Sequence, residues 1–177
     1  NTAPINISKL SECLDSIRAM TTQEPSVFCP SLINSLSECG IALVFLPHIG
    51  GSFLHGATFY EKDKIVIVLT VRGNDADKFW FSLFHEIGHI ILGHLNQEEG
   101  TTADNERDAD EFAREKLIPK TVFDQFTKAG KFNREALVSF AASNGIDPGI
   151  VVGRLQKEGY IEFSWYNDLK TRYTLSA

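Results

Sequence analysis

The chain has 177 residues, of which 43% are hydrophobic and 23% are charged. This length and composition are typical of a compact domain that buries a core without disulfide staples. The net charge is −6 and no long basic run occurs, which argues against nucleic-acid binding by this segment.

The cysteines, the apolar stretches and the first residues bear on where the chain resides. Cys13, Cys29 and Cys39 are odd in number and form no CxxC pair, so we expect free thiols in a reducing cytoplasm. Charged residues or histidines interrupt every apolar stretch well short of the roughly 18 residues that a membrane-spanning helix needs. Residues 1–10 show no signal peptide. They also lack an initiator methionine, so we expect a fragment or a processed chain.

Two helices and three strands are predicted in the first 70 residues. Ile7–Met20 carries apolar residues at helical spacing, and Ser31–Cys39 follows Pro30 and ends at Gly40. The strands are predicted at Ile41–Pro47, Gly56–Tyr60 and Ile65–Thr70. The charged turn EKDK joins the last two, which predicts a hairpin, and a glycine-rich loop separates the first two.

The rest of the chain is predicted to be mostly helical. Asn74 or Asp75 suits the N-cap of the first helix, and Gly159 ends the last one. Beyond it, Tyr160–Tyr166 alternates like a terminal strand. The predicted helices are Asp75–Leu95, Ala103–Leu117, Lys120–Ala129, Asn133–Ser143 and Asp147–Glu158.

This order of elements predicts an α+β fold. We expect a small three-stranded antiparallel sheet that packs on a mostly helical, zincin-like domain. The parts of this single domain are a helical N-terminal part at 1–40, the sheet at 41–70, the helices of a metal site at 75–118 and the C-terminal helices at 119–177.

One helix carries a narrow polar stripe in apolar surroundings. At 100° per residue, Ser82, His85, Glu86, His89 and Gly93 share one arc, and apolar residues occupy the rest of the helix. A buried glutamate between two histidines is costly unless it meets water or a metal. Two histidines at i and i+4 bring two imidazoles to one zinc ion, and the adjacent glutamate can act as a general base. The alternative is a chance HExxH pattern on a solvated helix face.

A catalytic zinc ion has three protein ligands and an open position. Glu106, Ala109, Asp110 and Ala113 fall on one face of a returning helix, where the two alanines permit a close approach to the histidine helix. We therefore predict Glu106 as the third ligand and Asp110 as the acceptor of a histidine N–H. The alternative for Glu106 is a first-turn carboxylate favoured by the helix dipole.

Other polar residues near this site are weaker candidates. The carboxylates Glu98, Glu99, Asp104 and Asp108 are predicted in the turn or on the outer helix face. His94 falls off the polar arc, so we expect a solvated helix end there. His48 and His55 flank the glycine-rich loop and could border a cleft. An oxyanion could be stabilised by Tyr60, Arg72 or Tyr166, and the sequence does not choose among them.

The segments FWFSLFHEIGH and ERDADEFAREKLIP together resemble the ImmA/IrrE family of zinc metallopeptidases. In that family, HExxH is followed by an ExxAxxFA helix whose glutamate completes the metal site. Both motifs match here, on the histidine helix and on Glu106, Ala109, Phe112 and Ala113. The tail NGIDPGIVVGRLQKEGYI is similar to members fused to a Cro/repressor-type helix-turn-helix, known as HigA-like antitoxins. Such a DNA-binding part would precede residue 1.

The sequence therefore predicts a cytoplasmic zinc metallopeptidase that hydrolyses a peptide bond in a protein substrate. The resemblance implies that the substrate is a transcriptional repressor or another regulatory protein. We expect the substrate to lie along the edge of the hairpin, beside Gly56, Ala57, Thr58, Phe59 and Tyr60.

Two rival functions use the same residues differently. One is a non-catalytic regulatory module that senses a ligand or partner, and the other is a DNA-binding antitoxin subunit. Ala136–Gln156 has helix-turn-helix spacing, but its few basic residues favour a packed helical pair.

Overall fold

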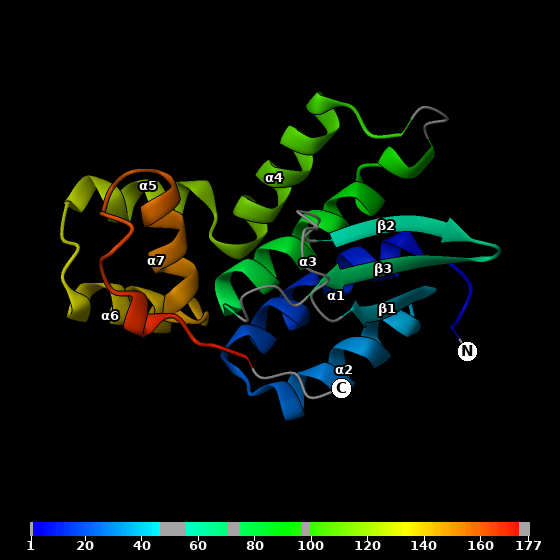
Figure 1. Cartoon of the computed structure of the whole chain (residues 1–177), viewed down its shortest axis with the longest axis horizontal. Helices are drawn as coiled ribbons and strands as arrows, with labels where there is room; N and C mark the ends of the chain where they lie inside the picture. Colours follow the sequence, from blue (N-terminus) through cyan, green and yellow to red (C-terminus); the bar gives the residue numbers. More distant parts are fainter. Residues whose placement is uncertain (1, 47–55, 71–74, 97–99, 174–177) are drawn as a thin grey trace.

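The computed structural model describes residues 2–46, 56–70, 75–96 and 100–173. Short 3₁₀ turns occupy Met20–Thr22, His94–Asn96 and Asn167–Leu169. The elements in chain order are α1 (Ile7–Ala19), α2 (Pro25–Ser37), β1 (Ile41–Leu46), β2 (Gly56–Glu61), β3 (Lys64–Thr70), α3 (Ala76–Ile91), α4 (Ala103–Leu117), α5 (Lys120–Ala129), α6 (Arg134–Asn144) and α7 (Pro148–Lys157). Figure 1 shows the sheet at one end of the molecule and α5–α7 at the other, with α3 and α4 between them.

The α+β fold class is confirmed, and one feature of the predicted sheet is wrong. The three strands lie in the order β1-β3-β2. β2 and β3 form the predicted antiparallel hairpin, with Gly56 opposite Leu69. β1, however, runs parallel to β3, with Ile41 opposite Ile65, so the sheet is mixed rather than antiparallel. β3 has a neighbouring strand on each side, and its run of β-branched residues is typical of such a central strand.

The second helix begins earlier than predicted. α2 starts at Pro25, and it continues through the internal Pro30 to Ser37. An internal proline costs a helix about 3 kcal/mol because it removes one backbone hydrogen bond. Three fully buried side chains on the same helix face offset this cost at roughly 1.5–3 kcal/mol each. They are Phe28, Leu32 and Leu36.

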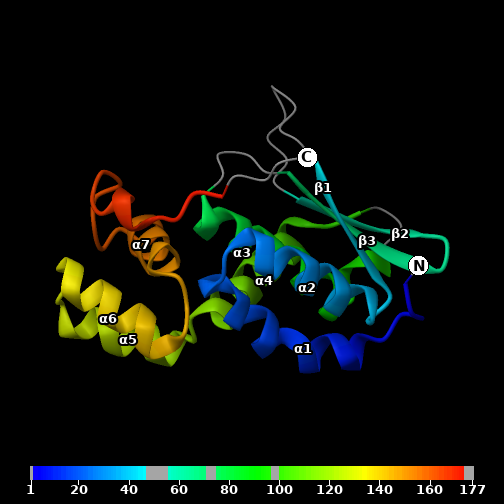
Figure 2. The ribbon, with the colours of Figure 1, turned by 90° about the horizontal axis from the view of Figure 1, so that it is seen from below.

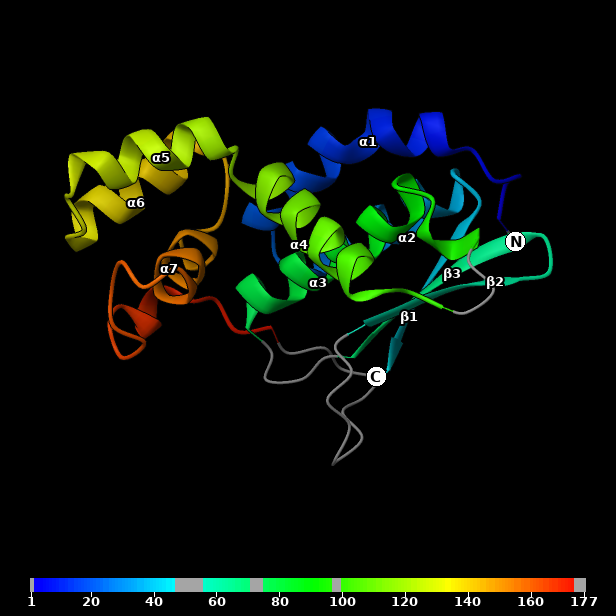
Figure 3. The ribbon, with the colours of Figure 1, turned by 90° about the horizontal axis from the view of Figure 1, so that it is seen from above.

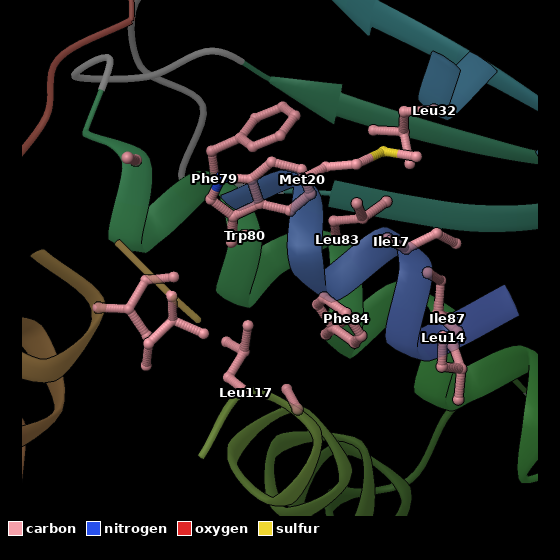
Figure 4. Packing of buried hydrophobic residues seen from close by; sticks show 14 of the residues in the cluster. Leu14, Ile17, Met20, Leu32, Phe79, Trp80, Leu83, Phe84, Ile87 and Leu117 are labelled. Atoms are coloured by element: carbon pink, nitrogen blue, oxygen red, sulfur yellow. The ribbon is translucent and has the colours of Figure 1, made fainter. Parts of the chain in front are cut away.

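α3 lies at the centre of the molecule and is buried on most of its sides. In Figure 4, its apolar face gathers Trp80, Leu83, Phe84 and Ile87 near side chains of α1. All four are fully buried. α3 also contacts β2, β3, α4 and α7. The helix that carries the HExxH motif is thus held by the sheet and by three other helices.

The C-terminal helices stand apart from the sheet, as Figures 2 and 3 show from two sides. After α7, the predicted strand Tyr160–Tyr166 is wrong: the segment forms turns. The side-chain amide of Gln156 donates hydrogen bonds to the carbonyls of Phe163 and Trp165, at 3.1 and 2.9 Å. Those carbonyls are acceptors that a strand would use in a ladder, so the buried glutamine replaces the missing neighbour strand.

The thiols of Cys13, Cys29 and Cys39 are free, and burial raises the pKa of Cys39 to about 11.

In the described part of the chain, no single helix is long and apolar enough to cross a membrane. α6 and α7 meet that criterion only as a pair that is bent by 116°.

Candidate metal centre

His85, His89 and Glu106 converge on one point between α3 and α4. The Nε2 atoms of the two histidines lie 3.0 Å apart. Glu106 places Oε2 3.2 Å from His85 Nε2 and Oε1 3.4 Å from His89 Nε2. These three residues form a group that could hold a metal ion. The i,i+4 spacing on α3 supplies two ligands, and the first turn of α4 supplies the third.

α4 can reach the histidines because the two helices pack closely. Ala109 and Ala113 are fully buried between them. On α3, a Cβ atom added to Gly88 would lie 3.3 Å from the Cα of Ala109 and 3.1 Å from a ring carbon of Phe112. A glycine facing an alanine thus sets the short separation that brings the Glu106 carboxylate to the imidazoles.

The remaining nitrogen of each histidine also has a partner. Asp110 Oδ1 lies 2.9 Å from Nδ1 of His85, and His94 Nδ1 lies 3.0 Å from Nδ1 of His89. A metal ligand that binds through Nε2 carries its proton on Nδ1 and donates it to such an acceptor. The structure therefore brings Asp110 to the position in which the sequence predicts it to act.

His94 contradicts the expectation of a solvated helix end. α3 ends at Ile91, and Gly93 adopts a left-handed conformation with φ of 74°. This turn folds His94 back onto His89, where only 7% of it is exposed. The sequence did not predict this contact, because the predicted helix Asp75–Leu95 extends beyond the actual end of α3 and so turns His94 away from His89. The histidine spacing HxxxxH was the only signal in the sequence.

The donor set fits a metal ion on chemical grounds. If Nδ1 of His85 donates to Asp110, then Nε2 presents a lone pair toward the carboxylate of Glu106, which is also an acceptor. Burial lowers the pKa of His89, with the neighbouring His85 as the next cause, so a neutral imidazole is favoured there as well. Acceptors that face one another repel unless a cation lies between them. Tetrahedral zinc with ligands at about 2.1 Å separates ligand atoms by about 3.4 Å, close to the distances here.

The carboxylate of Glu106 is suited to bind a cation. Its partial burial acts to raise its pKa, but a hydrogen bond with Thr101 and the two histidines hold the pKa below its ordinary value. Among the alternative carboxylates, Asp104 and Asp108 do not belong to the group of possible ligands, and Asp104 pairs with Arg107 at 3.0 Å. Glu98 and Glu99 lie outside the described residues.

Glu86 lies beside the triad in a buried position, with 6% of the residue exposed. Burial raises the pKa of Glu86, and a hydrogen bond from Thr58 opposes that rise. Thr58 Oγ1 donates to Oε2 at 2.5 Å. A Cβ on Gly56 would lie 2.6 Å from Oε1, so the glycine at the start of β2 leaves the space that this carboxylate occupies. Gly56 and Thr58 were predicted only as substrate contacts, and their role toward Glu86 depends on the packing of β2 on α3.

A cavity of about 1090 Å³ opens from the triad. Gly56, Ala57 and Thr58 line it, as do the polar residues of α3 from Ser82 to His89. Phe59 and Tyr60 do not line it and are 44% and 47% exposed, so only three of the five predicted contact residues reach this space. Tyr166 also does not line it, whereas His48, His55 and Arg72 lie outside the described residues.

Comparison with known proteins gives one positive finding. Residues 43–143, more than half of the chain, match the model of the family Peptidase_M78, described as the IrrE N-terminal-like domain. The matched region contains all three strands except the first two residues of β1, together with α3, α4 and the whole triad. Among curated proteins, no match to the chain is found.

Proposed function

Because the chain belongs to the IrrE N-terminal-like peptidase family, we propose that it is a zinc-dependent metallopeptidase that hydrolyses a peptide bond in a protein substrate. The observation that carries this proposal is the convergence of His85, His89 and Glu106 next to the buried carboxylate of Glu86. Two imidazoles and one carboxylate are a ligand set of catalytic zinc sites. A structural zinc site does not need a second glutamate, such as Glu86, that is not a ligand of the ion.

In this proposal, His85, His89 and Glu106 hold the zinc ion. When bound, zinc supplies Lewis-acid activation of water and of the scissile carbonyl. Asp110 and His94 keep the two imidazoles oriented with Nε2 toward the ion. Because burial favours neutral His89, this ligand needs no deprotonation at neutral pH.

Glu86 acts as the general base. Its carboxylate is poorly solvated, which makes it a stronger proton acceptor than an exposed glutamate. The Thr58 hydroxyl holds one oxygen in place and leaves the other beside Gly56. In the proposed reaction, Glu86 takes a proton from the attacking water and delivers it to the leaving amine.

The substrate segment would bind along β2. In the described sheet, β2 is an edge strand that pairs only with β3. The start of β2 lines the same cavity as the triad. An extended segment can add to such an edge through backbone hydrogen bonds, which brings a peptide bond to the site without requiring one particular side chain. A repressor or other regulatory protein is the substrate we propose, as the family resemblance implies.

The test is the substitution Glu86→Gln. The variant should bind zinc as the wild-type protein does and lose at least about 10²-fold in hydrolysis rate, because only the proton acceptor has gone. Zinc content is measured by elemental analysis. Hydrolysis is followed on the purified product of the neighbouring gene and on a peptide library from digested whole-cell protein.

Two further proteins complete the test. His89→Ala should lose both metal and activity, whereas exposed Asp104→Asn should keep both. If the wild-type and Glu86→Gln proteins cleave at the same rate, or if neither cleaves any substrate, the peptidase proposal fails and a regulatory module is favoured.

A further inference from the structure

The cavity extends well beyond the metal centre. From His89 and His85 it follows α3 toward Lys78 near the start of that helix. α7 and the tail that follows it line the far end, with Ile150, Gly153 and Phe163 among the contacts. The metal triad occupies one end of this space, and nothing in the proposed hydrolysis uses the other end.

The far end is positively charged, although the whole chain carries a net charge of −6. Three carboxylates at the metal end belong to Glu86, Glu106 and Asp110. Away from them, six basic side chains and three acidic ones line the cavity. The basic residues are Lys78, Arg114, Arg154, Lys157, Lys170 and Arg172, and the acidic ones are Asp75, Asp77 and Glu158.

Four of the six cations are already paired within the protein. Lys170 pairs with Asp77 at 3.1 Å, and both side chains are nearly buried. Lys78 and Arg172 share Asp75 at 3.2 and 3.7 Å.

Arg154 is the fourth paired cation and is tied to its surroundings most firmly. It binds Glu158 at 2.8 Å and donates to the carbonyls of Arg114 and Ile118. These bonds hold α7 against the end of α4, so the guanidinium of Arg154 stabilises the fold and is not free to bind a ligand.

Arg114 and Lys157 have no such partner. In the described parts of the chain, no carboxylate forms an ion pair with either residue. Arg114 is half-buried on the cavity wall, and Nζ of Lys157 lies 4.8 Å from the ring centroid of Phe81. Phe81 also lines the cavity. Lys157 over an aromatic ring and Arg114 on the wall of the same cavity are two cations that can pair with an acidic side chain.

The distance of this site from the metal centre sets the position of the acidic residue. Phe81 precedes His85 by one helical turn, about 6 Å along α3, and Arg114 follows Glu106 by about 12 Å along α4. An extended peptide advances about 3.3 Å per residue. The charge site is therefore about two to four residues from a peptide bond that lies at the triad.

We propose that Arg114 and Lys157 form a specificity site that selects protein segments with an Asp or Glu residue about two to four residues from the bond held at the metal centre. This inference rests on the proposed peptidase function, because it names the substrate class of the same cavity. Arg114 is half-buried and Lys157 is exposed, and the apolar residues Phe81, Leu117 and Ile150 line the same cavity.

Binding is measured with the zinc-loaded Glu86→Gln protein, so that the result does not depend on hydrolysis. The probes are fluorescein-labelled peptides that alternate leucine with glutamate, glutamine or lysine, which offer the charge in any register. The glutamate peptide should bind about 10- to 100-fold tighter than the glutamine peptide, as charge-assisted hydrogen bonds do. Added salt should reduce this preference.

Variants then locate the preference. Arg114→Gln combined with Lys157→Gln should abolish it without changing zinc content, and Arg114→Glu combined with Lys157→Glu should favour the lysine peptide. Lys116→Gln combined with Lys128→Gln removes the same charge from exposed positions outside the cavity and should keep the preference.

Three outcomes would overturn the inference: equal affinity for the glutamate and glutamine peptides, loss of preference in the Lys116 and Lys128 control, and tighter binding of a single-stranded oligonucleotide at Arg114 and Lys157. A wild-type protein that binds the glutamate peptide through these residues but cleaves nothing would refute the peptidase proposal and leave the acidic site standing. In a cleaving protein, acidic residues should be enriched at the stated positions in the cleavage profile of the peptide library.

Discussion

The two histidines of the metal centre differ in what holds their second nitrogen. Asp110 is the partner of His85, and the buried imidazole of His94 is the partner of His89. A carboxylate is a strong acceptor that raises the basicity of the ligand, whereas a neutral imidazole only orients it. In the proposed site, His94 would accept from Nδ1 of His89 and so leave Nε2 of His89 to face the metal.

We expect His94→Phe to weaken zinc binding by about 10- to 100-fold, because the Nδ1–H of His89 loses its acceptor in a buried site. His94→Gln keeps an oxygen acceptor and should retain part of the affinity. Zinc dissociation constants from competition with a chelator provide the measurement, and exposed Asp108→Asn is the control. Wild-type zinc affinity in His94→Phe would show that His94 does not position His89.

Among the helices, α3 and α4 together carry the residues of the candidate metal centre. α3 supplies His85, His89 and Glu86, and α4 supplies Glu106 and Asp110. Their relative position is set by Gly88 against Ala109 and by the fully buried Ala113. The capping box of α4, in which Thr102 and Asn105 exchange hydrogen bonds, fixes where this helix begins. Because Glu106 lies in that first turn, the cap also places the proposed third ligand.

Gly88→Val should therefore damage the metal site through packing. Replacing glycine by a residue with better helix propensity would by itself stabilise α3 by a fraction of 1 kcal/mol up to about 1 kcal/mol. Steric conflict with Phe112 and Ala109 should exceed this gain and cost about 1–3 kcal/mol.

The free energy of unfolding, from denaturant titration of the metal-free protein, and the zinc affinity should both fall. Gly88→Ala adds a single methyl group at this contact and should lower the zinc affinity less than Gly88→Val does. A Gly88→Val protein that is more stable than the wild-type protein and binds zinc normally would contradict the role assigned to this close contact.

At the scale of the whole molecule, the end of the chain closes the C-terminal helices onto α3. The backbone N–H of Ala76 donates to the carbonyl of Thr171 at 2.8 Å, and Asp75 forms an antiparallel bridge with Arg172. The indole N–H of Trp80 donates to the hydroxyl of Tyr173 at 2.7 Å. Both rings are buried in an aromatic cluster with Phe28 and Phe79. These contacts hold the tail that forms the far wall of the cavity.

We expect Tyr173→Phe to lower the free energy of unfolding by about 1–3 kcal/mol, since the buried indole N–H would lose its acceptor without gaining water. For a chain of this size, each kcal/mol corresponds to roughly 2–4 °C in melting temperature. Calorimetry of the metal-free protein gives both values. Tyr160→Phe removes a hydroxyl from a side chain that is 45% exposed and should change little. Equal losses in the two variants would show that the Trp80–Tyr173 bond contributes nothing specific.

Features that depend on local periodicity can be predicted from the amino-acid sequence alone. The spacing of α3 places His85, Glu86 and His89 on one stripe whatever surrounds the helix, because 3.6 residues per turn is a property of the backbone. The same reasoning predicted the bounds of α4 and α5 and the β2–β3 hairpin. It also predicted the positions of Glu106 and Asp110, because Ala109 and Ala113 on the same helix face indicate close packing against another helix.

Contacts between segments that are distant in the sequence depend on how the whole chain packs. The direction of β1 leaves no local trace, because a strand has the same alternation in a parallel or an antiparallel pair. Tyr160–Tyr166 has strand-like alternation, yet the side-chain amide of Gln156 donates hydrogen bonds to two of its carbonyls, and the segment forms turns. His94 lies beside His89 because the chain reverses at Gly93, and Arg114 and Lys157 face one cavity because α7 packs beside the end of α4. His85 and His89 meet because they lie one helical turn apart, whereas the approach of Glu106 and the surroundings of the triad depend on long-range packing that no window of sequence contains.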